Sequence, residues 1–332
     1  MRLHKLAVAV TAVVFALLFA PGLAISPAAA QDYPSRPINL IVGFPAGGST
    51  DVGARVVAGI AEKILGQPIV VVNRGGAGGQ IAWTELARAK PDGYTIGFLN
   101  LPATSTIILD PERQAVFNEG SFTPIANQVL DPGVVWVAAN SPFKTLKDVI
   151  DAAKAKPGTV RAATTGLLSD DHLAVLMVEE ANQGASFRLV HLLGSAAQLK
   201  ETLAGNIDVS FDNVGSIVPQ VRSGQVRALA VLDSERSKFL PDVPTTKELG
   251  MATIVSNSTR GIAGPKGMDP AIVKTLQEAF AKAMQDPDHI KALEASGLAT
   301  KVMVGAEYDK TYAETHEKAK KYIEWAKTRP QK

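Results

Sequence analysis

The chain has 332 residues, of which 20% are charged, and its 34 Lys and Arg against 32 Asp and Glu leave a formal net charge of +2. It contains no cysteine, which excludes a disulfide framework, a thiolate metal site and a lipid-modified N-terminal cysteine. With 46% hydrophobic residues, a chain of this length can bury two cores and is too long for one small domain.

The N-terminal segment has the pattern of a secretory signal peptide. Arg2 and Lys5 precede an uncharged apolar stretch over residues 6–20, and the small residues 28–30 come just before Gln31. An apolar core of about fifteen residues is short for a helix that crosses a bilayer. We therefore expect residues 1–30 to be cleaved near Ala30 and the mature protein to be periplasmic.

Removal of this segment takes away two basic residues, Arg2 and Lys5, and no acidic ones, so the formal charge falls from +2 to 0. A chain without net charge has no overall field that attracts nucleic acid or anionic lipid. We expect neither as a partner. Any preference for a charged ligand must then come from local groups in a pocket.

Three apolar runs separated by helical patterns open the mature chain. Each run is typical of a buried strand, and glycine turns lead from the first two into helices. The expected strands cover residues 37–44, 68–72 and 94–99, and the expected helices begin at Ser49 and cover residues 80–89. Fully apolar strands that alternate with helices predict a parallel sheet with helices on both faces.

The same alternation restarts after Asp131, Pro132 and Gly133. The expected strands are residues 134–138, 159–163, 187–192, 207–211 and 226–232, and the expected helices are residues 145–155, 171–182, 195–203 and 215–222. Residues 270–295 and 307–326 are then mostly helical and have no sheet of their own. A helical tail needs a partner that buries its apolar stripe, so we expect it to pack on the first sheet.

This arrangement requires the chain to cross between two domains twice, near residues 128–133 and 254–263. It divides the mature chain into a discontinuous first domain, residues 31–130 and 257–332, and a second domain, residues 131–256. Both are expected to be doubly wound α/β domains with a ligand cleft between them.

One glycine turn is a candidate binding site for an anion. Gly47, Gly48 and Ser49 lie between a strand and a helix whose first turn carries Asp51. This geometry exposes backbone amides at the positive end of a helix, where an anion can bind. A tight turn that merely needs glycine would have the same sequence, and for the glycine-rich residues 75–79 we favour such a packing role.

The motifs of the common cofactor and nucleophile sites are incomplete. Ile81 stands where a dinucleotide fingerprint starting at Gly76 needs glycine or alanine, Gln80 follows Gly79 where a P-loop needs lysine, and Ser49 lacks the second glycine of a nucleophile elbow. The histidines of the mature chain are not spaced as pairs of metal ligands. We therefore expect no cofactor and no metal, and a binding protein rather than an enzyme.

Short motifs in a fixed order resemble the Bug family, the substrate-binding proteins of tripartite tricarboxylate transporters. Each motif is weak alone, but together they are specific and extend over nearly the whole mature chain. They are residues 33–37, Phe44-Pro45-Ala46-Gly47-Gly48-Ser49-Thr50-Asp51, Gly66-Gln67-Pro68, Val72-Asn73-Arg74, Pro91-Asp92-Gly93-Tyr94-Thr95, Phe211-Asp212-Asn213 and Leu240-Pro241-Asp242-Val243-Pro244-Thr245.

The resemblance implies a type II periplasmic-binding-protein fold, in which two domains close on a small organic carboxylate. It also implies delivery of that ligand to transporter membrane subunits, and we expect the protein to be a monomer. In the family, two strand-to-helix loops grip a ligand carboxylate largely through backbone amides, and the matching loops here are residues 44–51 and 164–172. The expected ligand-binding residues are Phe44, Ala46, Gly47, Gly48, Ser49, Asp51, Gly78, Thr165, Gly166, Ser169, Asp170, Asp171, His172 and Asp212.

The second loop departs from the family pattern at Leu167, Leu168, Asp170 and Asp171, where small residues are usual. In one interpretation Asp171 caps the following helix, Asp170 faces water, and His172 lies in the first turn at the pocket rim. In the other, Asp170 faces the cleft, where it repels a second ligand carboxylate and attracts a hydroxyl or ammonium group. An alternative function is a secreted α/β enzyme or ligand-sensing module that acts on a small carboxylate, because fold alone does not determine function.

Overall fold

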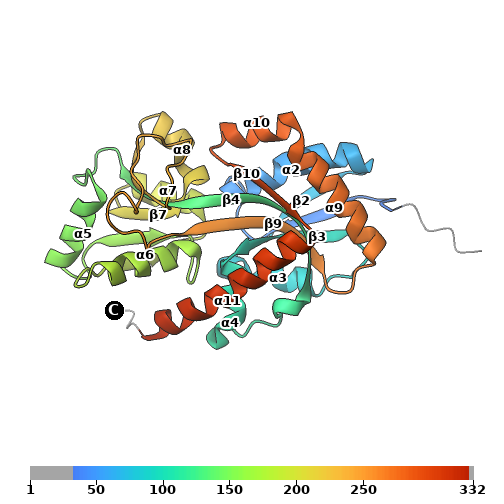
Figure 1. Ribbon diagram of the computed structural model, residues 1–332, viewed down its shortest axis with the longest axis horizontal. Coiled ribbons are helices and arrows are strands. Elements are labelled where there is room, and N and C mark those ends of the chain that lie inside the picture. The colour runs from blue at the N-terminus through green and yellow to red at the C-terminus, as the bar shows by residue number, and fades with distance from the viewer. Residues whose placement is uncertain (1–32, 329–332) are drawn as a thin grey trace, which may run out of the picture.

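A computed structural model describes residues 33–328, so the predicted signal peptide lies outside the described residues. Figure 1 shows two lobes, each with helices around strands. Two long strands, β4 (Phe122–Ala138) and β9 (Asn257–Pro265), pair with each other and connect the lobes. These strands therefore form the structural link on which the cleft between the lobes depends.

The first lobe contains the N-terminal strands and part of the C-terminal region. Its strands are β1 (Ile38–Val42), β2 (Ile69–Asn73), β3 (Thr95–Leu101) and β10 (Thr300–Val304). Its helices are α2 (Ser49–Leu65), α3 (Gln80–Ala87), α4 (Ala103–Leu109), α9 (Pro270–Gln285) and α10 (Pro287–Ala295), with short 3₁₀ turns η1 (Ala77–Gly79), η2 (Pro111–Arg113) and η3 (Glu119–Ser121). Strand β1 is parallel to both β2 and β3.

The second lobe repeats this layered arrangement. Its strands are β5 (Arg161–Thr164), β6 (Arg188–His191), β7 (Val209–Asn213) and β8 (Val226–Leu232), and its helices are α5 (Leu146–Ala155), α6 (Asp170–Ala181), α7 (Ser195–Leu203) and α8 (Val214–Arg222). Strand β5 is parallel to both β6 and β7.

Alternate side chains of the central strands enter different cores. In β1, Leu40 packs in one core with α2 and α9, whereas the next residue, Ile41, packs in another with α3 and α4. In β4, Val135 packs against α5 and α6, whereas Trp136 packs against α8. Because both faces of each sheet are buried, the strands are apolar without an alternating polar face.

The expectation of parallel sheets is correct only for β2, β1 and β3 in the first lobe and for β6, β5 and β7 in the second. Strands β4 and β9 run antiparallel to each other and to their neighbours, so the whole sheet is mixed. Strand β10, which pairs with β4, and helix α4 were not predicted. Residues 270–295 form two helices, because Asp286 ends α9 and caps α10 while Pro287 starts the new helix.

The strand expected at residues 134–138 begins earlier than predicted, because residues 131–133 belong to the same strand. These residues lie within β4, a single strand of 17 residues. Pro132 is tolerated where β4 changes partners: it lies opposite Asn257 of β9, while Gly133 lies opposite residues of β7 and β8. The domain limits expected at 130/131 and 256/257 stay a prediction; they fall inside β4 and just before β9.

The last helix, α11 (Ala306–Thr328), contacts both lobes. Tyr312 packs in the first-lobe core with α3 and α4, as expected of the helical tail. Ile323 is 5% exposed and belongs to the second-lobe core with α5 and α6. Figure 1 shows α11 crossing beneath β9 from one lobe toward the other. This helix is therefore a further link between the lobes.

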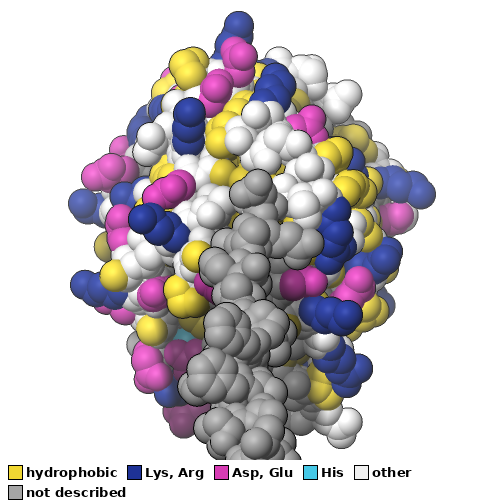
Figure 2. All heavy atoms as spheres, turned by 90° about the vertical axis from the view of Figure 1, so that its right-hand side faces the viewer, with side chains coloured by type: hydrophobic (Ala, Val, Ile, Leu, Met, Phe, Trp, Pro, Cys, Tyr) yellow, Lys and Arg dark blue, Asp and Glu magenta, His cyan; other side chains and the backbone are white. Residues whose placement is uncertain are grey.

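The face shown in Figure 2 has basic and acidic side chains interspersed, without a gathered basic patch. Across residues 33–328, none of the helices combines the length and the apolar character needed to span a bilayer.

Replacement of Ile323 by alanine should destabilise the protein by about 2–5 kcal/mol, because it leaves a cavity where α11 packs on the second lobe. Chemical denaturation measures this loss. Ile290→Ala is the matched control, since Ile290 on α10 is 36% exposed and should cost far less. Equal losses in the two variants would show that α11 does not hold the second lobe.

Candidate functional site

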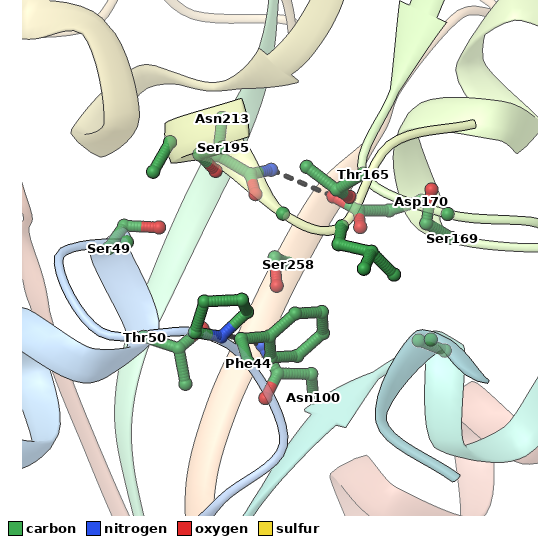
Figure 3. A pocket seen from close by; sticks show the side chains of 18 of the residues that line it. Phe44, Ser49, Thr50, Asn100, Thr165, Ser169, Asp170, Ser195, Asn213 and Ser258 are labelled. Carbon is green, nitrogen blue, oxygen red and sulfur yellow. Dashed lines mark hydrogen bonds between the residues drawn. The ribbon is translucent and has the colours of Figure 1, made fainter. Parts of the chain in front are cut away.

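A narrow cavity lies in the cleft between the lobes, where strands end and helices begin. Its inner chamber has a volume of about 40 Å³ and shares part of its wall with an outer chamber of about 160 Å³. Figure 3 shows Ser49, Thr50 and Asn100 of the first lobe on one side, and Asp170 and Asn213 of the second lobe on the other. In α/β sheets, this edge is where ligands bind.

Direct contacts across the cleft hold the lobes close together. Thr106 Oγ1 donates to Leu168 O at 2.7 Å, and Ser216 Oγ donates to Ser49 Oγ at 3.1 Å. These two contacts narrow the cleft between the lobes.

The turn between β1 and α2 presents helix amides to the cleft. Gly47 has φ 86°, which glycine adopts without strain, and the N-cap Gly48 has no side chain to cap α2. Asp51 lies behind this turn: it accepts a bond from Gly47 N at 2.9 Å and pairs with Arg55. Burial raises the pKa of Asp51, but bonds from Arg55, Gly47 and Asn73 outweigh it and lower the pKa. Asp51 thus stabilises the turn as an anion and does not line the inner chamber.

Helix α7 begins at the cavity in a similar way. Its N-cap is Gly194, and no side chain caps its first turn. Ser195 lines the inner chamber, and its hydroxyl donates to Asp212 Oδ1 at 3.0 Å and lies 3.1 Å from Ser216 Oγ. The positive ends of α2 and α7 therefore reach the chamber from different lobes.

Helix α6 begins one residue earlier than predicted and has a different cap. Its N-cap is Ser169, whose Oγ accepts a bond from His172 N at 3.2 Å, so the prediction that Asp171 is the cap is wrong. Asp171 lies in the first turn, where it accepts bonds from the amide and the hydroxyl of Thr165 and is buried outside the inner chamber. Asp170 lines the inner chamber and is 7% exposed, so it does not face bulk water.

His172 lies inside the second lobe and not at the pocket rim. Its Nδ1 accepts a bond from Leu168 N at 3.0 Å, and its ring packs edge-on against His191 with centroids 4.8 Å apart. Burial, with the nearby His191, lowers the pKa of His172 to about 3, so the ring stays neutral near pH 7. His172 supports the backbone of Leu168, which has a φ of 61° that is uncommon for leucine.

A buried arginine lines the floor of the inner chamber and was not predicted. Arg260 on β9 is 3% exposed, and its Nη2 lies 3.1 Å from Asp131 Oδ2 and donates to Asn213 Oδ1 at 2.7 Å. Asn213 Nδ2 donates in turn to Asp170 Oδ2 at 2.8 Å, the bond drawn in Figure 3. Arg260 Nη1 is buried without a hydrogen-bond partner. The floor therefore combines a fixed cation with a fixed carboxylate.

The carboxylates around this floor lie in an unfavourable environment for charge. Burial is the main cause in each case. It raises the pKa of Asp131 to about 6 and that of Asp212 to about 7. It also raises the pKa of Asp170, and it raises the pKa of Asp171 well above its usual range. The charge of Arg260 opposes the rise for Asp131, Asp170 and Asp212.

The structure places the predicted ligand-binding residues in two groups. Those that line the inner chamber are Phe44, Gly48, Ser49, Gly78, Thr165, Gly166, Ser169 and Asp170. Those that do not line it are Ala46, Gly47, Asp51, Asp171, His172 and Asp212. Contact of any of them with a ligand stays a prediction.

Further residues that line the inner chamber were not predicted from the sequence, among them Asn100, Ser195, Asn213, Ser258 and Arg260. A local signal existed for Ser195, which follows glycine between a strand and a helix, and for Asn213, which follows Asp212 in a family motif. Asn100, Ser258 and Arg260 lie within or beside strands and carry no such signal. In residues 33–328, the acidic and histidine side chains form no group of three or more that could hold a metal ion.

The free energy of unfolding should decrease between pH 6 and pH 8 because Asp212 is buried. Its pKa is about 7 in the folded protein, and an aspartate in the unfolded chain titrates near 4. The folded protein therefore holds a proton that the unfolded chain has lost, and ionising the buried group costs about 1 kcal/mol of unfolding free energy across this window. Asp212→Asn should remove this part of the pH dependence, measured by urea denaturation at both pH values.

Histidines with lowered pKa act in the opposite direction, because they take up a proton only in the unfolded chain. The Asp212→Asn variant and the unchanged chain contain the same histidines, so the histidine contribution cancels when the two proteins are compared. The same pH dependence in both proteins would contradict a proton on Asp212.

Known proteins share both the sequence and the architecture of this chain. A protein of Cupriavidus necator described as "UPF0065 protein in gbd 5'region" is 37% identical over 91% of this chain and 92% of its own length. "Protein BugT" of Bordetella pertussis is 35% identical over 82% of this chain and 83% of its own length.

Solved structures have the same two-lobed fold. "Structure of a periplasmic transporter" has a TM-score of 0.82 at 33% identity and covers 88% of this chain and 97% of its own. MatC of Rhodopseudomonas palustris with bound malate has a TM-score of 0.80 at 26% identity, covering 88% and 100%. Another R. palustris protein, with adipate, has a TM-score of 0.82 at 25% identity, covering 89% and 98%.

The fold is thus that of the periplasmic solute-binding proteins, with two α/β lobes around a cleft. The sequence matches the family described as "Tripartite tricarboxylate transporter family receptor" over residues 53–327. With a match over most of its length, and with close relatives over almost all of it, this chain belongs to the tripartite tricarboxylate transporter receptor family.

Proposed function

We propose that this protein captures a small organic carboxylate in the cleft between its lobes and delivers it to the membrane subunits of a tripartite transporter. The observation that carries the proposal is the convergence of α2 and α7, whose uncapped N-termini face the inner chamber from the two lobes. Such helix ends bind anions through free backbone amides and the helix dipole. The family name, and the malate and adipate in related structures, support a carboxylate as that anion.

The protein acts, in this proposal, as a receptor without catalysis. We expect it to bind its ligand as a monomer, and the walls of the chamber come from residues of both lobes. The ligand carboxylate bridges the two lobes, so binding favours the closed arrangement in which Ser49 contacts Ser216. Rotation of the lobes about β4 and β9 opens the cleft for ligand entry and release.

The site in the first lobe can be tested by removing one amide hydrogen while keeping the helix. Ser49 is the first residue of α2, where proline is well accepted, and Gly48 has the extended conformation (φ −79°, ψ 165°) that suits a residue before proline. Ser49→Pro should weaken carboxylate binding about tenfold or more, since a bond to a charged group contributes about 1.5–3 kcal/mol. Isothermal titration calorimetry against a carboxylate panel measures the loss.

Ser49→Ala is the matched control, because it removes the hydroxyl and keeps the amide. It should therefore bind more tightly than Ser49→Pro. Equal affinities for the two variants, with unchanged melting temperatures, would contradict the anion site on α2. Incubation of each binding carboxylate with the protein, followed by product analysis, tests the receptor against an enzyme, which would convert the compound.

We further propose that the protein is exported and that residues 1–30 are removed. The support is the signal pattern of the sequence together with the periplasmic proteins of the same fold. When the full chain is expressed with its leader in a Gram-negative host, the periplasmic fraction should contain a form that begins at or near Gln31. Intact mass spectrometry measures this; a full-length chain that stays with the membrane would overturn the assignment.

A further inference from the structure

The second lobe presents two helix ends of opposite character to the inner chamber. Helix α7 begins at Gly194 without a side-chain cap, so its positive end is available to an anion. Helix α6 begins at Ser169 with a side-chain cap, and its first turn carries Asp170 and Asp171. These acids already occupy the positive end of α6. An anionic ligand group is therefore better placed toward α7 and α2 than toward α6.

The orientation of Asp170 is determined by a chain of hydrogen bonds. A guanidinium can only donate, so the bond from Arg260 Nη2 at 2.7 Å must reach the amide oxygen of Asn213. The amide nitrogen of Asn213 then faces Asp170 and donates to its Oδ2 at 2.8 Å. Asp170 is thus held as an acceptor in the chamber wall, and a carboxylate can accept more bonds than this one.

A second acceptor lies in the wall of the same chamber, in the first lobe. Asn100 is 6% exposed and lines the chamber. Its Nδ2 donates to Thr50 Oγ1 at 2.9 Å, which leaves its Oδ1 buried without a hydrogen-bond partner. A buried acceptor without a donor is unfavourable, so a hydroxyl or ammonium group of the ligand that reached this oxygen would stabilise the complex.

The acidic groups near this wall disfavour a further anion beside Asp170. Asp170 has Asp131, Asp171 and Asp212 as acidic neighbours in the buried cluster, and Arg260 is the cation that faces them. A ligand carboxylate against Asp170 would add a like charge where water is largely excluded. A hydroxyl or ammonium group would instead donate to Asp170 and to Asn100.

We propose that the ligand is a small carboxylate that carries a hydroxyl or ammonium group, with Asp170 and Asn100 as the acceptors that select it. The carboxylate binds at the starts of α2 and α7, and the donor group lies against Asp170. This inference rests on the proposed function, because it names the substrate class of the same cleft.

Matched sets of acids test the selection on the unmodified mature protein. Each set shares one skeleton and differs in one substituent: butyrate, 2-hydroxybutyrate and 2-aminobutyrate, and likewise succinate, malate and aspartate. Calorimetry should show that the hydroxyl or ammonium member of a set binds at least tenfold more tightly than the member with hydrogen. Equal affinities within every set would overturn the inference and leave carboxylate capture intact. Binding of no acid in either set would contradict the proposed function itself.

Asp170→Asn then identifies the residue responsible. It should reduce the preference for the ammonium member at least tenfold, while the member with hydrogen binds as before or more tightly because a repelling charge is gone. Asp151→Asn is the control for net charge, since Asp151 is an exposed second-lobe residue paired with Lys147, and it should keep the full preference. If Asp170→Asn kept the full preference for the ammonium member, the role of Asp170 would be overturned. If that variant does not fold, the acid sets still test the selection on the unmodified protein.

Discussion

The antiparallel pairing of β4 with β9 is the constraint on which the rest of the structure depends. These strands continue from one lobe into the other, so both lobes contain part of the same pair of strands. Their register places Ser258 opposite Asp131 and Arg260 opposite Val129. Arg260 consequently lies beside Asp131 and beneath the cavity. The link between the lobes and the floor of the cleft are thus made from the same residues.

The ion pair at this floor also shows why a charged group can be buried here. A buried arginine or aspartate is costly unless it is paired and hydrogen-bonded. Asp131 accepts a bond from Gly215 N at 3.0 Å, and Arg260 Nη2 bonds Asn213 at 2.7 Å in addition to its approach to Asp131. Both residues are therefore fixed in place by elements of the second lobe, although they lie on strands that are shared with the first.

The cavity contains separate regions for opposite charges. The helix ends of α2 and α7 are positive and bear no carboxylate toward the chamber, whereas Asp51 lies behind the first of them and neutralises Arg55. The start of α6 is acidic, and its carboxylates are buried among further acids. A ligand with one charge sign could satisfy only one of these regions. The arrangement therefore favours a polar ligand with chemically different ends.

Local patterns in the sequence predicted most elements of regular structure. The apolar runs at residues 37–44 and 68–72 correspond to β1 and β2, and the glycine turn before Ser49 starts α2 as expected. These predictions succeed because burial on both faces of a sheet requires apolar strands, and because glycine permits backbone conformations that other residues avoid. The family resemblance, carried by motifs along the chain, agrees with the family match over residues 53–327.

The sequence by itself therefore determined the α/β class, the order of most strands and helices, and the turn that offers amides to an anion. Tertiary structure decided what depends on contacts between distant residues: Asp131-Pro132-Gly133 continues a strand because β9, β7 and β8 pair with it, although the tripeptide alone is typical of a turn. It also decided that Ser169 rather than Asp171 caps α6 and that His172 is buried. In the same way, only the fold brings Arg260 into hydrogen-bond contact with Asn213, which lies 47 positions earlier in the chain. Side-chain burial and strand partners depend on which segments meet in space, and no local pattern contains that information.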